Sequence, residues 1–242
     1  MINIIFPATG RGKYSKAIAV MLAVSIVAIC ITVQSAGAQI KSRKTEYTVI
    51  IDAGHGGFDG GAVSESGITE KEINLSIAEK LENLLTFYGY NCIMTRTDDN
   101  AIGNSDGGKA TKSADMKKRV EIMNKYDGAI FISIHQNKFT EDAGVKGFQA
   151  FYRADDENGK LLANSVQTAI RENIDKENNR KEKADTRGIF ILKNAKIPAI
   201  IAECGFLSNT EDLQNLCSEH YKNRLAFTLA GGINNYFETQ NR

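Results

Sequence analysis

Apolar residues recur along the chain in two alternating patterns. Short, nearly continuous apolar runs are typical of strands buried on both faces of a sheet. Such runs occupy residues 47–52, 91–95, 128–135, 147–152, 188–192 and 199–203. Apolar residues at every third or fourth position predict amphipathic helices, at residues 70–88, 115–126, 158–177 and 219–237. Because strands and helices alternate, we expect a single α/β domain whose mostly parallel or mixed central sheet carries helices on both faces.

Two polar segments lie between these elements. Residues 98–113 are rich in glycine and predict a long surface loop, whereas residues 173–187 carry charges of both signs and predict a solvated helix end and loop. The first segment contains a literal G-x-S-x-G pattern at residues 103–107. A nucleophilic serine in that pattern must directly follow a strand, so its position in a polar loop argues against a serine hydrolase.

The amino-terminal part of the chain has the pattern of an export signal. Basic residues precede an uncharged apolar run at residues 17–33, and small residues follow at 36–38. The apolar run is slightly shorter than the roughly 20 residues that span a bilayer. We therefore expect residues 1–38 to be a signal peptide, cleaved after Ala38, or an N-terminal membrane anchor that is kept. A bulky Ile29 directly before Cys30 argues against lipidation.

The rest of the chain is expected to form a linker at 39–46, a folded domain at 47–238 and a tail at 239–242. The formal net charge is +1, although residues 1–45 contribute six basic residues and no acidic one. The folded domain is therefore mildly acidic, which argues against nucleic acid as a partner. Membrane contact is expected only through an uncleaved leader.

Cysteine usage is compatible with export but predicts no cross-linked framework. Cys30 lies in the leader, which leaves Cys92, Cys204 and Cys217, an odd number without a C-x-x-C pair. Neither a disulfide framework nor a zinc knuckle is predicted from this spacing. Cys92 and Cys204 fall in apolar runs, where a small buried thiol is the ordinary interpretation.

A histidine lies in a glycine-rich turn directly after the first predicted strand. Residues 52–61 read D-A-G-H-G-G-F-D-G-G, with His55 between glycines that allow a sharp turn. A phosphate-binding loop is the main alternative. Asp59 occupies the third glycine position of the dinucleotide pattern, however, and the G-K-[ST] ending of a P-loop is absent. Because ligands of open α/β sheets bind beyond the carboxyl ends of strands, His55 is a candidate site residue.

The first predicted helix begins with two acidic residues that we expect to differ in role. Thr69 and Glu72 have the spacing of a capping box, in which each side chain accepts a hydrogen bond from a free backbone N–H. Glu70 lies between them and remains free to point toward the junction of strand and helix. A favourable charge near the helix dipole is the alternative explanation for Glu70.

His135 ends a second apolar run and is the natural partner of His55. The chain holds only three histidines, and two of them follow strands. The third, His220, lies in the closing helix and is expected to be a surface or structural residue. Two imidazoles and the Glu70 carboxylate would leave an open coordination position for water, which is the usual ligand set of a catalytic zinc.

A carboxylate ends a third apolar run. Glu203 follows residues 199–202, and burying it there is costly unless it has a partner. Beside a metal site it would serve as general base and then acid. A structural ion pair is the alternative, and Arg96 and Arg119 are the expected partners in either case.

These segments together resemble the zinc-dependent N-acetylmuramoyl-L-alanine amidases of the Amidase_3 type. The matching blocks occur in order at residues 52–57, 70–75, 95–98, 119–120, 133–137 and 203–209, and the resemblance spans about residues 46–238. It implies a zinc amidase (phosphorylase/hydrolase-like) fold, Zn²⁺ ligands at His55, Glu70 and His135, and a catalytic carboxylate at Glu203. Two departures lie beside these positions: Ala53 stands where the family usually has proline, and Gln136 where a small residue is common.

The resemblance further implies a substrate and a location. The enzyme would cleave the lactyl-amide bond between muramic acid and L-alanine in peptidoglycan, on the extracytoplasmic face of the membrane or in the cell wall. A single catalytic module behind a leader is similar to the spore-cortex (CwlD-type) amidases of endospore formers, which contribute to muramic-δ-lactam formation. That subgroup implies the forespore intermembrane space and a regulatory or lipoprotein partner.

Three alternatives remain open from the sequence. A vegetative autolysin would have the same chemistry, and a zinc peptidase would cut within the stem peptide instead. A non-catalytic wall-binding or regulatory module on the same fold is the alternative from another class. The presence of all four candidate site residues argues against the last of these.

Overall fold

The computed structural model describes residue 21, residues 46–104 and residues 111–240. The expected leader, the linker up to residue 45 and the serine-containing part of the polar loop, residues 105–110, lie outside the described residues. The described elements belong to one compact unit, Lys44–Arg242. Within the residues described, none of the helices combines the length and the apolar character needed to cross a membrane.

A six-stranded mixed sheet forms the centre of the unit, as the alternation of elements predicts. Its strand order is β2-β1-β3-β6-β4-β5. All neighbouring strands are parallel except β4, which runs antiparallel to β6. The strands span Thr48–Ala53 (β1), Asn91–Met94 (β2), Ile130–Asn137 (β3), Gln149–Arg153 (β4), Lys183–Asp185 (β5) and Ala199–Phe206 (β6).

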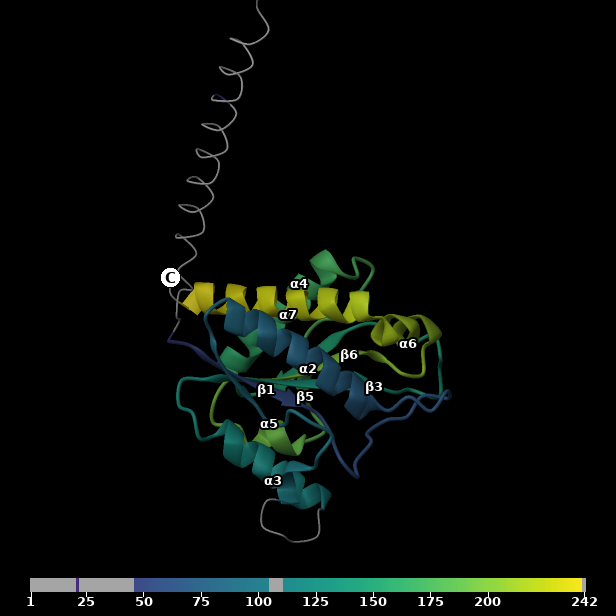
Figure 1. Cartoon of the computed structure of the whole chain (residues 1–242), viewed down its shortest axis with the longest axis horizontal. Helices are drawn as coiled ribbons and strands as arrows, with labels where there is room; N and C mark the ends of the chain where they lie inside the picture. Colours follow the sequence, from purple (N-terminus) through teal and green to yellow (C-terminus); the bar gives the residue numbers. More distant parts are fainter. Residues whose placement is uncertain (1–20, 22–45, 105–110, 241–242) are drawn as a thin grey trace, which may run out of the picture. The chain divides into compact units, whose positions relative to one another are not determined.

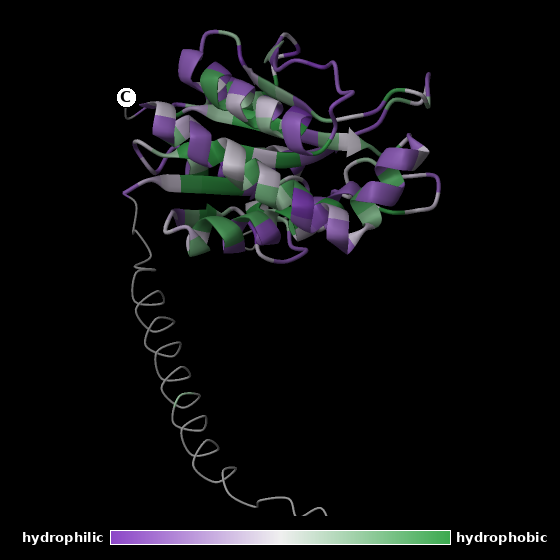
Figure 2. Cartoon of the chain, turned by 90° about the horizontal axis from the view of Figure 1, so that it is seen from above, coloured by the Kyte–Doolittle hydropathy of each residue, from purple (hydrophilic) through white to green (hydrophobic). Residues whose placement is uncertain are grey.

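Helices cover both faces of this sheet (Figure 1). On one face pack α2 (Glu70–Phe87), α4 (Glu157–Asn173) and α7 (Glu219–Gln240), which contribute with the sheet to the larger apolar core. On the other face α3 (Lys112–Met123) and α5 (Phe190–Asn194) close a smaller core. Hydrophobic residues gather on the strands and on the inward faces of the helices (Figure 2). Burial on both faces explains why the strands read as continuous apolar runs.

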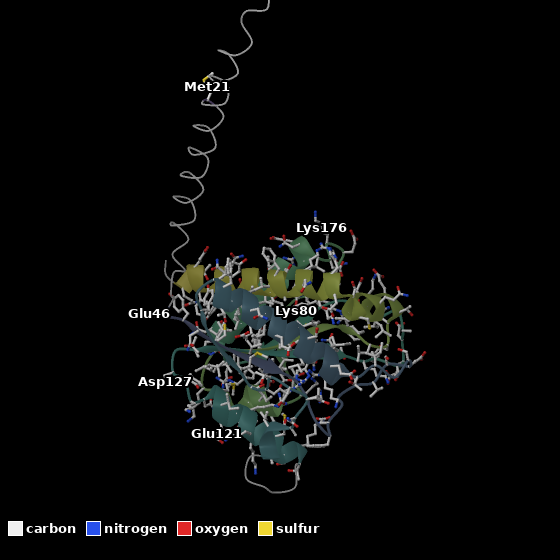
Figure 3. The ribbon with its side chains drawn as sticks, viewed as in Figure 1. Met21, Glu46, Lys80, Glu121, Asp127 and Lys176 are labelled. Atoms are coloured by element: carbon white, nitrogen blue, oxygen red, sulfur yellow. The ribbon has the colours of Figure 1, made fainter. Side chains whose placement is uncertain are left out.

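Several charged side chains lie on the outer surface of these layers. Glu121, Asp127 and Lys176 are exposed and lie at the periphery of the unit (Figure 3). The apolar faces of the helices are therefore available for the sheet, as expected for amphipathic helices.

One predicted strand is wrong. Residues 188–192 do not extend the sheet; instead Phe190–Asn194 forms the short helix α5. The Asp185 carboxylate accepts a hydrogen bond from the Ile189 backbone N–H (2.6 Å), which turns the chain directly after β5. The edge of the sheet is occupied by Lys183–Asp185, three residues of the segment predicted to be a charged loop.

Two shorter elements were also not predicted from the apolar periodicity. A 3-10 turn, Ile102–Asn104 (η1), lies inside the predicted surface loop, and α6, Thr210–Cys217, precedes the closing helix. Asn209 directly precedes α6, and its side chain accepts a hydrogen bond from the Asp212 N–H and so caps the helix.

The parallel strands place their carboxyl ends at one edge of the sheet. Adjacent strands β1, β3 and β6 all end there, because each pairs in parallel with its neighbour. Side chains that follow these strands are therefore brought together even though they lie far apart in the sequence. This edge holds the candidate functional site.

Candidate functional site

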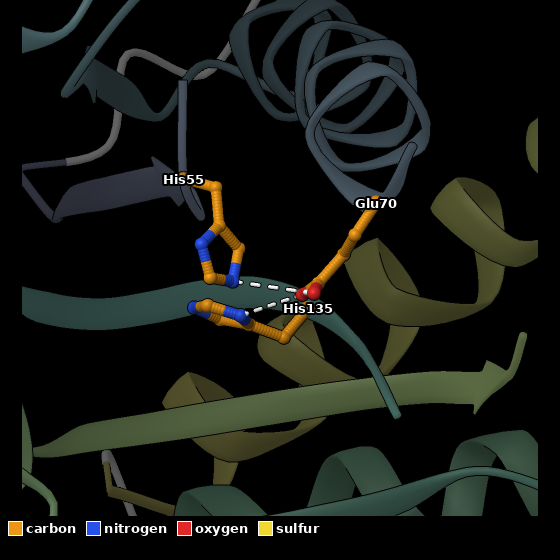
Figure 4. Close-up of side chains that lie close together, drawn as sticks. All are labelled: His55, Glu70 and His135. Atoms are coloured by element: carbon orange, nitrogen blue, oxygen red, sulfur yellow. Dashed lines mark hydrogen bonds and ion pairs between the residues drawn. The ribbon is translucent and has the colours of Figure 1, made fainter. Parts of the chain in front are cut away.

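Three side chains that could hold a metal ion converge at the carboxyl edge of the sheet. His55 follows β1, Glu70 is the first residue of α2, and His135 lies near the end of β3. Each offers one ligand atom, and these atoms lie within 4.8 Å of one another. The structure thus brings together the three residues that the sequence proposes as ligands (Figure 4).

Glu70 is the centre of this group. Its Oε1 accepts from His135 Nδ1 at 2.8 Å, and its Oε2 lies 3.2 Å from His55 Nε2. The carboxylate also accepts backbone N–H bonds from Ala62 (2.8 Å) and Gln136 (3.0 Å). Although burial favours the neutral acid, the hydrogen bond from His135 keeps the pKa of Glu70 well below its usual value. The residue is therefore a buried, ionised carboxylate, which is the state that can bind a cation.

The capping box predicted at the start of α2 is wrong. Thr69 occupies the N-cap position, but its side chain makes no capping bond, and its buried Oγ1 has no partner among the described residues. The helix donors are instead satisfied by the preceding loop, because Glu70 N–H donates to Ala62 O and Lys71 N–H to Gly60 O. This loop also folds back onto the Glu70 carboxylate, and it thereby fixes the first residue of the helix.

His55 lies in a loop whose backbone is unusual. Its φ is +62°, which makes it the non-glycine residue with positive φ within the described residues. Such a conformation is disfavoured for residues with a Cβ and is kept only where the surroundings impose it. Two contacts do so here: Arg119 donates to the His55 carbonyl (2.6 Å), and the His55 ring Nδ1 lies 2.9 Å from the Asp59 carboxylate. The second contact turns Nε2 toward Glu70.

Two buried arginines hold the loop carbonyls. Arg119 donates to the carbonyl of Ala53 (2.9 Å), and Arg96 donates to those of Ala53 (2.9 Å) and Gly54 (3.0 Å). Arg119 is itself paired with the buried carboxylates of Asp52 and Asp115. The expectation that these arginines pair with Glu203 is therefore wrong. Arg119 binds the His55 loop and the buried acids below it, and Arg96 donates to backbone carbonyls of that loop and its surroundings.

His135 is positioned by the sheet and by Gly54, the residue without a side chain that faces its ring. A Cβ built at Gly54 would lie 2.4 Å from the His135 ring, so only glycine allows the loop to approach the ring this closely. The rings of His55 and His135 meet edge to face, with centroids 4.9 Å apart. Gln136, a departure from the family pattern, adds a hydrogen bond from its Nε2 to Asn74 Oδ1 (3.1 Å). It thus supports the strand beside the site.

Glu203 lies on β6 directly beside His135. The two residues are register partners on the neighbouring parallel strands β3 and β6. The Oε2 atom of Glu203 is buried and has no hydrogen-bond partner among the described residues. Burial raises the pKa of Glu203 above its usual value. A carboxyl group in this state can both accept and hold a proton.

A cavity of about 480 Å³ opens beside these residues. Its lining includes His55, His135 and Glu203, together with apolar side chains from the α3 and α5 side of the sheet. A larger cavity of about 660 Å³ lies between α4 and α7, but none of the candidate site residues lines it. Of these two cavities, the former is the one where the candidate chemistry and the space for a substrate coincide.

The remaining candidates from the sequence lie elsewhere. His220 is exposed in α7, in agreement with a surface role. Cys92, Cys204 and Cys217 are free thiols, of which Cys204 is buried, Cys92 is half-buried and Cys217 is exposed. None of them belongs to the His55, Glu70 and His135 group.

Sequence reasoning missed Asp59 as a contact of His55. Its four-residue spacing from His55 in a glycine-rich turn was the available signal, since the turn returns the chain onto the histidine through paired hydrogen bonds of Gly56 and Asp59. The buried group of Asp52, Ser133 and Thr95 was also missed. Asp52 accepts hydrogen bonds from the hydroxyls of Ser133 (2.5 Å) and Thr95 (2.6 Å).

Comparison with known proteins places this geometry in a family. Residues 49–235 match the sequence profile of N-acetylmuramoyl-L-alanine amidases of the Amidase_3 type. A germination-specific N-acetylmuramoyl-L-alanine amidase of Bacillus subtilis is 31% identical over 191 residues, which cover 78% of this chain and 79% of the relative.

Solved structures agree with the profile. The CwlD amidase of Clostridioides difficile, determined in complex with the GerS lipoprotein, is 37% identical with a TM-score of 0.74, covering 79% of this chain and 98% of that one. A second N-acetylmuramoyl-L-alanine amidase, from Clostridium difficile 630, is 30% identical with a TM-score of 0.69, covering 80% and 98%. The six-stranded sheet and its helices are thus shared with enzymes of this family.

Proposed function

The chain belongs to the Amidase_3 family of N-acetylmuramoyl-L-alanine amidases, enzymes of peptidoglycan, and from this premise we propose that it is a zinc-dependent member with Glu203 as its catalytic carboxylate. The observation that carries the proposal is the convergence of the ligand atoms of His55, Glu70 and His135 within 4.8 Å, beside Glu203, whose buried Oε2 has no hydrogen-bond partner among the described residues. The bond cleaved is the lactyl amide between muramic acid and L-alanine.

The residues present fit a zinc ion. Two imidazoles and one carboxylate are the donor types that zinc takes in hydrolytic sites, with one coordination position left open. Glu70 is a buried carboxylate held by backbone N–H groups, and the His55 ring nitrogen away from Glu70 is held by Asp59. A carboxylate behind a histidine is the usual support of such a ligand. We therefore assign His55, Glu70 and His135 as the zinc ligands.

The chain's own residues then account for the proton transfers. A bound zinc ion supplies Lewis acidity that favours attack of water on the amide carbonyl. Glu203 accepts a proton from the attacking water and returns it to the alanine nitrogen as the C–N bond breaks. Its raised pKa suits this step, because the carboxyl must hold the proton between acceptance and release. The products are a lactyl carboxylate on muramic acid and a stem peptide with a free amino terminus.

A comparison of two variants tests the assignment. Glu203→Ala should keep zinc but lose about 10²–10⁴-fold in activity, as expected for removal of a general acid–base group, whereas His135→Ala should lose both zinc and activity. Metal content measured on the purified variants, and mass spectrometry of digested peptidoglycan, provide the two readouts. Wall hydrolysis that persists in Glu203→Ala contradicts the mechanism, and new amino termini other than alanine would indicate a peptidase instead.

We also propose that the enzyme acts outside the cytoplasm, in the spore cortex, and contributes to muramic-δ-lactam formation. Support comes from the similarity to the germination-specific amidase and to CwlD. The second of these was solved with a lipoprotein, so a lipoprotein or other regulatory partner is proposed for this chain as well. Cortex muropeptides of a strain lacking the gene should contain no muramic-δ-lactam. An unchanged cortex would favour a vegetative autolysin of the same chemistry.

A further inference from the structure

One positively charged side chain that lines the cavity beside Glu203 forms no ion pair with another residue of that lining. Two ion pairs account for four of the charged side chains lining this cavity, Arg119 with Asp115 (2.9 Å) and Lys112 with Asp59 (3.3 Å). The two remaining are Glu203 and Arg187. Since Glu203 is assigned to proton transfer, Arg187 is the charged group whose purpose the reaction leaves unexplained.

Arg187 contacts an aromatic ring and a carboxylate, but the hydrogen-bonding capacity of its guanidinium is free. The guanidinium carbon lies 4.8 Å from the centre of the Phe151 ring, a distance at which a cation is attracted to an aromatic face. Its nearest carboxylate, Asp185, is 3.7 Å from Nε and accepts backbone N–H bonds from Arg187 (3.0 Å) and Ile189 (2.6 Å). Within the part of the chain that the structure describes, the guanidinium donates no hydrogen bond. The Arg187 side chain is 59% exposed.

The cavity that Arg187 shares with the reacting groups has an apolar part. Ile189, Ile191 and Ile201 line the same cavity. Such a lining suits the aliphatic part of a short peptide, whereas a planar guanidinium at its rim suits a carboxylate, which it can bind through two parallel N–H bonds. The cavity therefore combines apolar side chains with a guanidinium whose N–H donors are available to an anion.

We propose that Arg187 binds a free carboxylate of the stem peptide and thereby determines which peptides the enzyme accepts. This inference rests on the amidase reaction proposed above, since it concerns the leaving side of that same cleavage. A peptide whose carboxylate is converted to a carboxamide loses the charge that Arg187 recognises. The enzyme should therefore discriminate between the two forms.

A different role for Arg187 makes a different prediction. Its positive charge also acts on Glu203 and opposes the rise in the pKa of that carboxyl. If this were its only function, replacing Arg187 would alter kcat and its pH profile for every substrate equally. A subsite instead alters KM, and only for substrates that carry the carboxylate.

The test uses two synthetic muramoyl peptides that differ only in a free carboxylate or a carboxamide on the residue after alanine. With the full-length zinc-loaded enzyme, Arg187→Ala should raise KM for the acid form about tenfold, as expected for loss of a charge-assisted contact at a solvent-exposed side chain. Its kcat should stay within about twofold, and its KM for the carboxamide should not change. Arg187→Lys, which keeps the charge but not the planar fork, should be intermediate.

Lys193→Ala is the matched control, because Lys193 is an exposed cation on the adjacent helix α5 and does not line this cavity. Equal losses on both substrates, or equal effects of Arg187→Ala and Lys193→Ala, would overturn the subsite. Failure of the wild type to cleave either peptide would instead reject the amidase reaction. Calorimetry with the acid and amide forms of the released peptide then still decides the subsite, since only the acid form should bind in an Arg187-dependent manner.

Discussion

The two histidines of the site reach the same point by different physical means. His135 belongs to β3, which is hydrogen-bonded on both sides to β1 and β6. Its ring is further confined by the Gly54 backbone, which leaves no room for a Cβ. His55 belongs to a loop and has a left-handed backbone that the sheet does not impose. Its position comes from Arg119 on its carbonyl and from Asp59 on its ring.

This difference shows where the site is sensitive to change. The position of His135 is a property of the sheet, so it is set by the same interactions that stabilise the fold. The position of His55 depends on a few side-chain hydrogen bonds, one of which comes from a residue 64 positions away. Substitutions in those side chains should therefore disturb one histidine and leave the other in place.

The largest change in stability is expected from a substitution of Asp52, which pairs with Arg119, the arginine that holds the His55 carbonyl. Asp52→Asn keeps the size of the side chain but removes a negative charge that Arg119 pairs with in the interior. It should lower the free energy of unfolding at neutral pH by about 3 kcal/mol. Burial opposes ionisation, but Arg119 holds the pKa of Asp52 below its usual 3.8. The stabilisation is thus complete above pH of about 4 and is lost as the pH falls through the folded-state pKa.

Urea unfolding at several pH values checks this prediction. The difference between wild type and Asp52→Asn should be constant from pH 7 to about 4 and then shrink. Asp99→Asn is the control, because Asp99 forms an exposed pair with Lys71 (2.6 Å), and such pairs contribute about 0–1 kcal/mol. Equal destabilisation by the two variants, or a difference that does not depend on pH, would refute the anchoring role.

The next effect concerns the contact that confines His135. Gly54→Ala would place a Cβ 2.4 Å from the ring, and we expect about 1–3 kcal/mol of strain together with displacement of the ring and weaker zinc binding. Gly60→Ala is the control, since its nearest neighbour would be Thr69 Cγ2 at 3.9 Å. Chelator competition measures the zinc affinity of both. Unchanged affinity in Gly54→Ala would mean that the sheet alone fixes His135.

The smallest effect is expected from the carboxylate behind His55. Asp59→Ala removes the partner of Nδ1 and should weaken zinc binding about 10–100-fold, with little change in unfolding free energy. Asp59→Asn, which can still accept a hydrogen bond, should retain part of the affinity. Asp99→Ala serves as the control, because Asp99 accepts from the Gly57 N–H of the same loop but does not contact His55. An equal loss in Asp99→Ala would indicate that loop rigidity, not the ring contact, is responsible.

Much of the fold could be predicted because apolar periodicity reflects burial. The strands at 48–53, 130–137 and 199–206 coincide with continuous apolar runs, since each is covered by helices on both faces. Residues 188–192 show the limit of this reasoning. A run of only five residues has no period that separates a buried strand from a buried helical turn. Here the Ile189 backbone N–H donates to the Asp185 carboxylate, which turns the chain away from the sheet after β5.

The candidate site could be located for a similar reason, whereas its support could not. Residues that end adjacent parallel strands must lie close together, so His55, His135 and Glu203 were expected at one edge. Which acid or base supports each of them depends on side-chain directions that strand order does not determine. Arg119 was thus expected beside Glu203 but holds the loop instead. Thr69 and Glu72 had the spacing of a cap, yet the loop carbonyls of Gly60 and Ala62 took the helix donors.

The proposed metal ligands and the proposed acid–base group come from separate segments of the folded domain. All three ligand candidates lie before β4, whereas Glu203 arrives on β6, after the antiparallel strand has been added to the sheet. Binding of the ion and turnover of the substrate are therefore separable by mutation. On this assignment, a single substitution of Glu203 during evolution would convert the enzyme into a receptor that still binds murein but no longer hydrolyses it.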